Sequence, residues 1–198
     1  MVLAVLLGAA PARADGFVDV AGGVAIPVEN YWWRLNNPSP KLGVRLGATM
    51  HANPVWSIGI LASGDWTYVR SFPGEFGFDF AADRFDRFRV LSSLIVLHPV
   101  AAKVAVGIRI GAGADVAHAS HAFRFGGTTQ SRSDTDAGFA FEAAAGAWYD
   151  IGARAHVGGE LGAPIGHHAE QPPPSSKVAW FDYTSVDIDL LIALRVRF

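Results

Sequence analysis

The last fourteen residues of the chain, SVDIDLLIALRVRF, alternate strictly between two kinds of side chain. Every second position from Val186 to Phe198 is apolar, whereas the positions between them include two aspartates and two arginines. A repeat of two residues is typical of a β-strand, because successive side chains of a strand point to opposite faces. The segment is therefore predicted to be a strand, and its two faces allow two environments. Either its apolar face covers a soluble core, or that face meets lipid while the charged face lines a lumen.

The same alternation recurs along the chain, which predicts eight strands and no helix between them. In each segment valine, leucine and isoleucine occupy one face, and glycine, hydroxyl and charged residues occupy the other. The segment 84–97 is the least regular, because Leu91 and Ile95 fall on the face that carries Arg87 and Arg89. The seven further segments are residues 17–28, 41–52, 55–68, 84–97, 103–116, 137–149 and 154–165.

The predicted connections between these strands alternate in length. Three are tight, around residues 53–54, 98–102 and 150–153, and four are long and polar or rich in turn residues. Alternating short turns and long loops in an even-stranded antiparallel sheet are typical of transmembrane β-barrels, with the short turns on the periplasmic side. The predicted long loops are residues 29–40, 72–83, 124–136 and 166–177.

Charge decides which face of these strands points outward. Arg45, Arg109 and Arg195 all lie opposite the aliphatic face of their strands. An arginine facing lipid at mid-bilayer costs about 2–4 kcal/mol, so the reversed barrel would lose about 6–12 kcal/mol on these three. A soluble eight-stranded binding barrel, such as a lipocalin, would need the opposite arrangement, with apolar residues inside. The pattern therefore favours an apolar face toward lipid and a charged interior.

Composition removes several other classes of protein. The 198 residues are 51% hydrophobic and 17% charged, with a net charge of -2. This balance gives no electrostatic reason to expect nucleic acid as a partner. The chain has no cysteine, which excludes disulfides and thiolate metal sites. No window holds the roughly 20 uninterrupted apolar residues of a membrane helix.

The N-terminal segment MVLAVLLGAAPARADG is typical of a secretory signal peptide. Its apolar run ends at Pro11, and Ala12-Arg13-Ala14 fits the small-x-small rule for cleavage. The segment lacks the usual N-terminal lysine or arginine, which a translation start placed downstream of the true one would explain. We expect residues 1–14 to be the signal peptide and residues 15–198 to form the barrel.

From residue 15 to its end the chain resembles the small eight-stranded outer-membrane barrels, the group of the OmpA transmembrane domain and OmpX. The resemblance rests on the signal LLGAAPARA, the eight alternating segments and a last strand ending in Phe198. It implies an all-β, antiparallel, up-and-down transmembrane barrel in the outer membrane of a Gram-negative cell envelope, reached by export through the periplasm. It also implies outer-membrane lipid, lipopolysaccharide and the barrel-assembly machinery as partners, the last through the C-terminal strand. The implied role is structural or one of surface contact.

The charged interior allows two interpretations. An eight-stranded barrel is only wide enough for side chains to fill, so its charges should pair into a polar plug. The alternative is a narrow, porin-like channel for ions or small solutes, because the many small interior residues leave room for water. The predicted interior charges are Asp19, Arg45, Asp65, Arg87, Arg89, Arg109, Asp115, Glu142, Glu160, Asp187, Asp189 and Arg195. The predicted membrane-interface aromatics are Trp56, Trp66, Tyr68 and Phe198.

Two further patterns resemble a hydrolase site and a metal site, but neither is complete enough to predict one. His118 and Ser120 match the His-x-Ser pair of some lipid-modifying hydrolases of the outer membrane, but the nearest glutamate, Glu142, faces inward. Histidines near the predicted outer mouth have the side chain that zinc, copper or nickel prefers, but they come from non-adjacent strands and loops. These histidines are His118, His121, His167 and His168. We therefore expect no enzyme activity, no metal and no cofactor, with a hydrolase as the remaining alternative.

Overall fold

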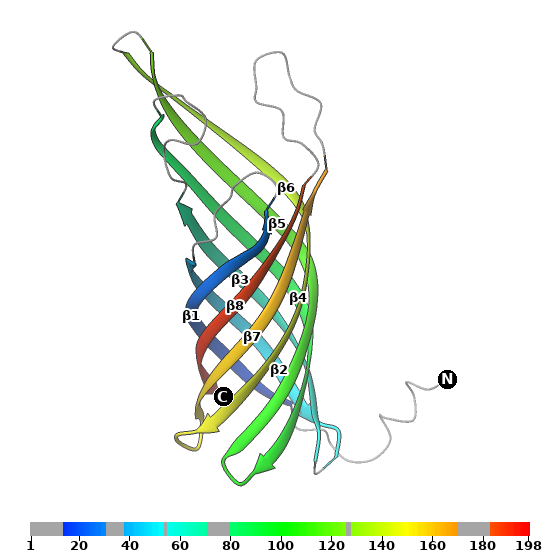
Figure 1. Ribbon diagram of the computed structural model, residues 1–198. Helices are drawn as coiled ribbons and strands as arrows, with labels where there is room; N and C mark the ends of the chain where they lie inside the picture. The colour runs from blue at the N-terminus through cyan, green and yellow to red at the C-terminus, as the bar shows by residue number, and fades with distance from the viewer. Residues whose placement is uncertain (1–13, 31–37, 54, 71–79, 126–127, 170–182) are drawn as a thin grey trace.

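The computed structural model describes residues 14–30, 38–53, 55–70, 80–125, 128–169 and 183–198. These residues form eight strands that close into one barrel, which confirms the predicted fold (Figure 1). The strands are β1 Ala14–Asn30, β2 Ser39–His51, β3 Ser57–Arg70, β4 Phe80–Ala101, β5 Val104–Phe125, β6 Thr128–Asp150, β7 Ala155–His168 and β8 Tyr183–Arg197. No helix in these described ranges is long and apolar enough to cross a membrane. The predicted signal peptide lies almost entirely outside them.

Each strand pairs antiparallel with the next one along the chain, and β1 pairs with β8 to close the barrel. The start of β1 and the end of β8 lie at the end of the barrel that carries the short turns (Figure 1). There the N–H of Phe198 donates to the carbonyl oxygen of Gly16 at 2.9 Å. A side chain at Gly16 would collide with the Phe198 ring, since its Cβ would lie 2.5 Å from a ring carbon. Glycine at this position therefore lets the last aromatic ring lie across the closing seam.

The outer surface of the barrel is apolar and the interior is polar. Large aliphatic side chains are widely exposed on the outside, and Ile60, Leu94 and Ile192 are 66%, 62% and 70% exposed. Arginine and aspartate side chains are buried inside instead. This arrangement is the reverse of a water-soluble protein and suits a barrel whose outside is covered by lipid.

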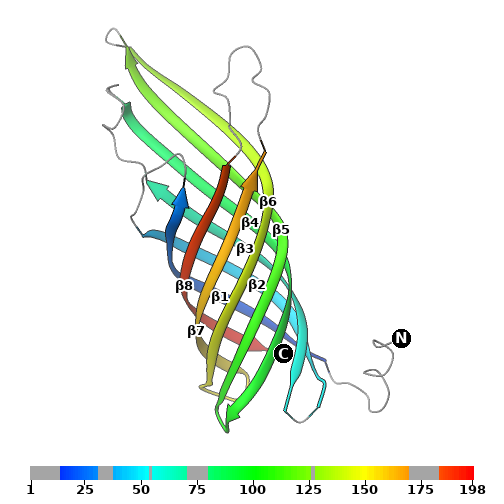
Figure 2. The same ribbon diagram turned by 45° about the vertical axis from the view of Figure 1, so that its right-hand side comes forward.

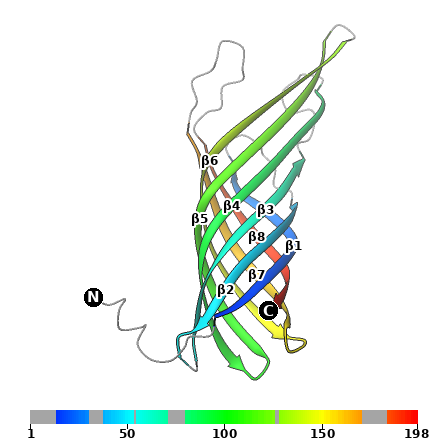
Figure 3. The ribbon, with the colours of Figure 1, turned by 180° about the vertical axis from the view of Figure 1, so that it is seen from behind.

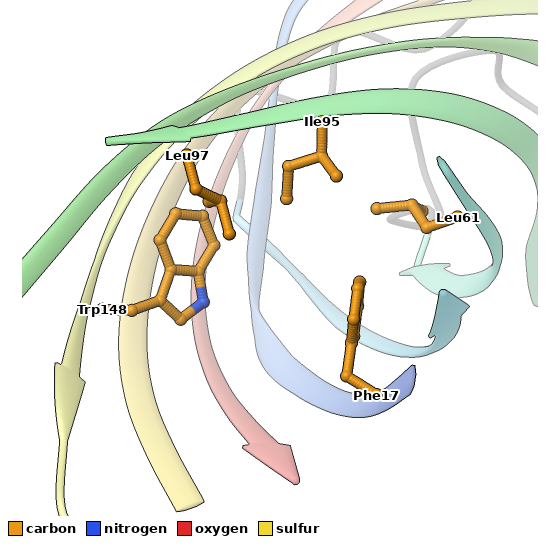
Figure 4. Packing of buried hydrophobic residues seen from close by; sticks show 5 residues of the cluster. All are labelled: Phe17, Leu61, Ile95, Leu97 and Trp148. Atoms are coloured by element: carbon orange, nitrogen blue, oxygen red, sulfur yellow. The ribbon is translucent and has the colours of Figure 1, made fainter. Parts of the chain in front are cut away.

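One layer of the interior, near the short-turn end, is apolar. It consists of Phe17, Leu61, Ile95, Leu97 and Trp148, whose side chains approach one another across the barrel (Figure 4). This layer explains part of the irregular alternation of β4, because Ile95 belongs to it. Leu91 and Ile95 point inward, with exposures of 1% and 0%, just as Arg87 and Arg89 do. An aliphatic residue on the inner face of this strand is therefore part of the packing.

Strands β4, β5 and β6 extend beyond the other five at the long-loop end (Figures 2 and 3). They are 22, 22 and 23 residues long, against 13 to 17 for the others. The predicted loop 124–136 is wrong, because residues 128–136 belong to β6. The predicted loops 72–83 and 166–177 begin or end within strands, since β4 starts at Phe80 and β7 runs to His168. Above the bilayer no strand face needs to be apolar, so the alternation that predicts strands disappears there.

Candidate functional site

The interior of the barrel gathers charged side chains from all eight strands. The twelve charged residues predicted to line it are all buried, with none more than 6% exposed. Four ionisable residues outside that set are also buried on the inner face, namely Lys41, Asp136, His156 and His168. Lys41 adds a second cation to β2 beside Arg45. The structure thus brings all twelve predicted residues into one continuous interior.

At the short-turn end Arg195 and Asp19 form a two-point ion pair. Nε and Nη2 of Arg195 each donate to one carboxylate oxygen of Asp19, both at 2.7 Å. The guanidinium also lies over the rings of Phe17 and Trp148, with distances of 4.1 and 4.9 Å to the ring centroids. Arg195 therefore joins the apolar layer to the charged residues above it, through a cation–π contact on one side and an ion pair on the other.

The middle of the interior is organised around Arg109. Its guanidinium donates to both carboxylate oxygens of Glu142, at 3.0 and 2.8 Å, and lies 3.4 Å from Glu160. Arg45 contacts the same glutamate, with Nη1 2.6 Å from Oε2 of Glu160. A two-point arginine–carboxylate contact is among the strongest in proteins, and its geometry holds both side chains in place.

Lys41 occupies the space between two aspartates of this middle region. Its ammonium donates to Asp189 and lies 3.7 Å from Oδ2 of Asp65. Within the described part of the chain, neither oxygen of Asp65 has a hydrogen-bond partner. Asp65 is therefore a buried carboxylate without a hydrogen bond among the described residues, and its contact with Lys41 is an ion pair at longer range.

A third group of charges closes the long-loop end. Arg87 contacts two carboxylates, with Nε 2.9 Å from Asp115 and Nη1 2.6 Å from Asp187. His168 lies beside them, with Nδ1 2.8 Å from Oδ2 of Asp136 and Nε2 3.8 Å from Oδ2 of Asp115. Gly166 leaves room for this group, because a Cβ there would lie 2.2 Å from Oδ2 of Asp115.

The residues missing from the predicted set differ in how readily the sequence shows that they face inward. Lys41 begins an alternating segment and occupies an inward position of its two-residue repeat, so the repeat alone identifies it as an interior residue. Asp136 and His168 lie where β6 and β7 leave the apolar band, within or beside segments predicted to be loops. Only the extension of those strands shows that their side chains point inward.

The aromatic residues predicted at the membrane interfaces lie toward the two ends of the barrel. Trp56, in the first short turn, stacks on His98 with the ring centroids 4.5 Å apart. Trp66 and Tyr68 are neighbours near the other end, with centroids 6.2 Å apart. Phe198 is 70% exposed beside the start of β1. Their contact with the edges of a bilayer, where aromatic rings are enriched, stays a prediction.

The described geometry gives little support to a hydrolase site or a metal site. Nδ1 of His118 pairs with the hydroxyl of Thr135 at 2.8 Å, while Glu142 lies inside the barrel against Arg109. His118 and His167 lie on the outer face, whereas His168 is buried inside, so these three do not converge. The side chain of His121 lies outside the described part. Among the described residues no group of three metal-ligating side chains comes together.

Solved structures match this barrel over nearly its whole length, although no protein-family model and no curated protein matches the sequence. A major outer membrane protein from Thermus thermophilus gives a TM-score of 0.60 at 12% identity, covering 94% of this chain and 100% of that one. Ail, the attachment invasion locus protein of Yersinia pestis, gives 0.51 at 14%, covering 94% and 99%. The chain has the fold of the outer-membrane β-barrels. The outer membrane protease OmpT of Escherichia coli shares it, with a TM-score of 0.52 at 8% identity over 93% and 97%.

At these identities the likeness establishes the fold. It confirms the resemblance read from the sequence, and together with the apolar exterior it supports a location in the bacterial outer membrane. The presence of a protease among the matches shows that this architecture does not by itself distinguish an enzyme from a protein without activity.

Proposed function

We propose that the chain is an integral outer-membrane barrel with a closed interior, whose role is structural or one of surface contact and not catalytic. The observation that carries this proposal is the filling of the interior. Buried, mutually paired charges occupy its middle and its long-loop end, and the apolar layer of Phe17, Leu61, Ile95, Leu97 and Trp148 lies across its short-turn end. An eight-stranded barrel filled in this way has no continuous path for water.

A role in surface contact is consistent with the strands that rise above the barrel. β4, β5 and β6 continue beyond the other strands at the end where outer-membrane barrels carry their extracellular loops (Figures 1 and 3). One protein with the same fold is described as an attachment invasion locus protein, and this supports the proposal of surface contact. In this chain, the extended strands are where a partner outside the cell would meet the protein first.

A narrow channel is the second candidate, and the charge of the interior favours it. The buried interior carboxylates outnumber the buried arginines and lysines by eight to six among the described residues. The carboxylates are Asp19, Asp65, Asp115, Asp136, Glu142, Glu160, Asp187 and Asp189, and the cations are Lys41, Arg45, Arg87, Arg89, Arg109 and Arg195. An open state lined by such an excess would select cations.

An ion-flux assay on liposomes separates these candidates. The purified, folded barrel is reconstituted into vesicles loaded with a potassium-sensitive dye, and a general porin serves as the positive control. A closed barrel gives the same potassium leak as empty vesicles. A leak that increases with the amount of folded barrel would reject the closed interior and favour the channel.

A further inference from the structure

The pairing of β7 with β8 is interrupted inside the apolar band of the barrel. Pairing stops at Gly162 and Asp189 and resumes at Ile165 and Val186, so two residues of each strand are left out of the ladder. The outward side chains beside the gap are aliphatic, and Leu161 and Ile165 are 55% and 40% exposed. The interruption therefore faces the hydrocarbon of the bilayer, where backbone groups depend on hydrogen bonds within the barrel.

A proline in β7 accounts for the interruption. Pro164 lies in the gap and has no N–H to donate to the ladder. On its other side Pro164 pairs in register with Glu142 of β6, and the ladder between β6 and β7 is continuous. The loss of pairing is therefore confined to the side of β8. We call this stretch, residues 162–165 of β7 and 186–189 of β8, the β7–β8 seam.

The same part of β8 is also irregular toward β1. The register of β1 and β8 shifts between Pro27 and Glu29, which lie opposite Asp187 and Val186. A bulge of this kind leaves one residue unpaired and disrupts the ladder locally. Residues 190–196 of β8, in contrast, pair regularly with both neighbouring strands. At the height of the seam, β8 is thus held less completely by its backbone than it is below.

Ion pairs from inside the barrel hold this part of β8 instead. Nη1 of Arg87, on β4, lies 2.6 Å from Oδ2 of Asp187, and Nη2 of Arg89 lies 3.5 Å from the same oxygen. Arg87 also donates to the hydroxyl of Ser185. Lys41, on β2, donates to Asp189. The inward side chains of β8 at the seam therefore all contact a cation from another part of the wall.

The wall is thin at the seam, and the charged interior lies directly behind it. The inward positions of β7 on either side of Pro164 are glycines, Gly162 and Gly166, and the outward residue beside it is Ala163. A Cβ at Gly162 would lie 3.1 Å from Oε1 of Glu142. Little side-chain material thus separates the interior charges from the outside at this point.

We propose that the barrel wall opens sideways at the β7–β8 seam, and that Arg87, Arg89 and Lys41 form a latch that holds the seam closed from inside. The seam lies toward the long-loop end from Trp148 of the apolar layer, whose register partner on β7 is Gly158. An opening there would expose the charged middle of the interior through the wall while the axis stays blocked. The inference concerns the wall, so a barrel that is closed in the ion-flux assay can still open here.

The test is hydrogen–deuterium exchange of the folded barrel in lipid nanodiscs, measured by mass spectrometry. We expect the amides of residues 186–189 to exchange about tenfold faster than those of residues 190–196 in the same strand. Pro164→Ala restores an N–H to the ladder and should slow exchange at the seam several-fold. Arg87→Gln removes part of the latch and should speed it several-fold, with no change at residues 44–48 of β2.

A disulfide across the seam provides a lock, because the chain has no cysteine of its own. Ala163→Cys/Ile188→Cys places thiols at the positions that continue the register across the gap, and Val157→Cys/Leu194→Cys is the matched control at a regular pair of the same strands. Oxidation of the first variant should slow exchange at the seam to the rate of residues 190–196, and oxidation of the control should leave it fast.

Equal exchange along the whole of β8 in the parent protein would overturn the proposal. So would a seam lock that leaves exchange unchanged, or an Arg87→Gln variant that loosens β2 as much as the seam. Should Arg87→Gln fail to fold, Pro164→Ala and the two disulfide variants decide whether the seam opens, and Arg89→Gln tests the latch by the same criterion.

Discussion

At the scale of single residues, the interior depends on pairing more than on burial. Arg109 compensates Glu142 and Glu160 at once, and Arg195 compensates Asp19 while it covers two aromatic rings. A buried ion pair adds little stability compared with an apolar pair of the same size, but removing one partner leaves the other charge buried and alone. The charged interior should therefore be intolerant of single substitutions.

Arg109→Ala is the sharpest test of that dependence. The variant leaves Glu142 without its two-point partner, so we expect the free energy of unfolding to fall by about 3–5 kcal/mol. Urea titration of the folded barrel in lipid vesicles measures the change. Arg154→Ala, on an exposed turn, is the control and should stay within about 0.5 kcal/mol of the parent. Equal stabilities of the two variants would show that the Arg109 pairs contribute nothing.

Two glycines of β7 provide a matched pair for the packing at the long-loop end. A Cβ at Gly166 would lie 2.2 Å from Asp115, whereas the nearest atom to a Cβ at Gly159, on the outer face, is 3.9 Å away. Overpacking a filled interior typically costs about 1–3 kcal/mol. We expect Gly166→Ala to lower the unfolding free energy by that amount and Gly159→Ala to leave it unchanged or slightly raised, as measured by urea titration. A similar response at both positions would contradict the close packing around Asp115.

At the scale of elements, the apolar face of each strand is both what the sequence reveals and what the membrane requires. Residues 41–52 and 185–198 were predictable nearly to their ends because lipid demands an aliphatic side chain at every second position. The outer parts of β5 and β6 were not, because a strand above the bilayer has polar residues on both faces. TTQSRSDTD, at the start of β6, has the composition of a loop and forms a strand only through its pairing with β5.

Depth along these strands should set the cost of a lipid-facing charge. Ile110 lies in the middle of the outer face of β5, and Val28 lies near the long-loop end of β1. Both are widely exposed, so neither substitution disturbs the interior. We expect Ile110→Arg to lower the unfolding free energy by about 2–4 kcal/mol and Val28→Arg by about 0–1 kcal/mol. Urea titration in vesicles checks the difference, and equal costs would contradict the assigned position of the bilayer.

At the scale of the whole molecule, the sequence predicts which charged residues face the interior better than it predicts which of them form ion pairs. Parity along the strands placed the predicted charges on the inner face, because a strand in a barrel has only two sides. The alternation along a strand does not show which charges form ion pairs across the barrel. Arg45 with Glu160 and Arg87 with Asp187 join strands that are far apart in sequence, and their contacts depend on register around the closed sheet. The apolar layer was hidden for the same reason, since its five residues come from four strands and approach one another only after closure.

The closed interior is tested most directly by the single-channel conductance of the folded barrel in a planar bilayer, across salt concentration and voltage. The paired charges and the apolar layer predict no discrete current steps. Discrete steps in the parent protein, altered in size or selectivity by Arg109→Ala or Asp187→Ala, would contradict the account and make the interior a cation path. Silence would direct the search for function to the outer ends of β4, β5 and β6.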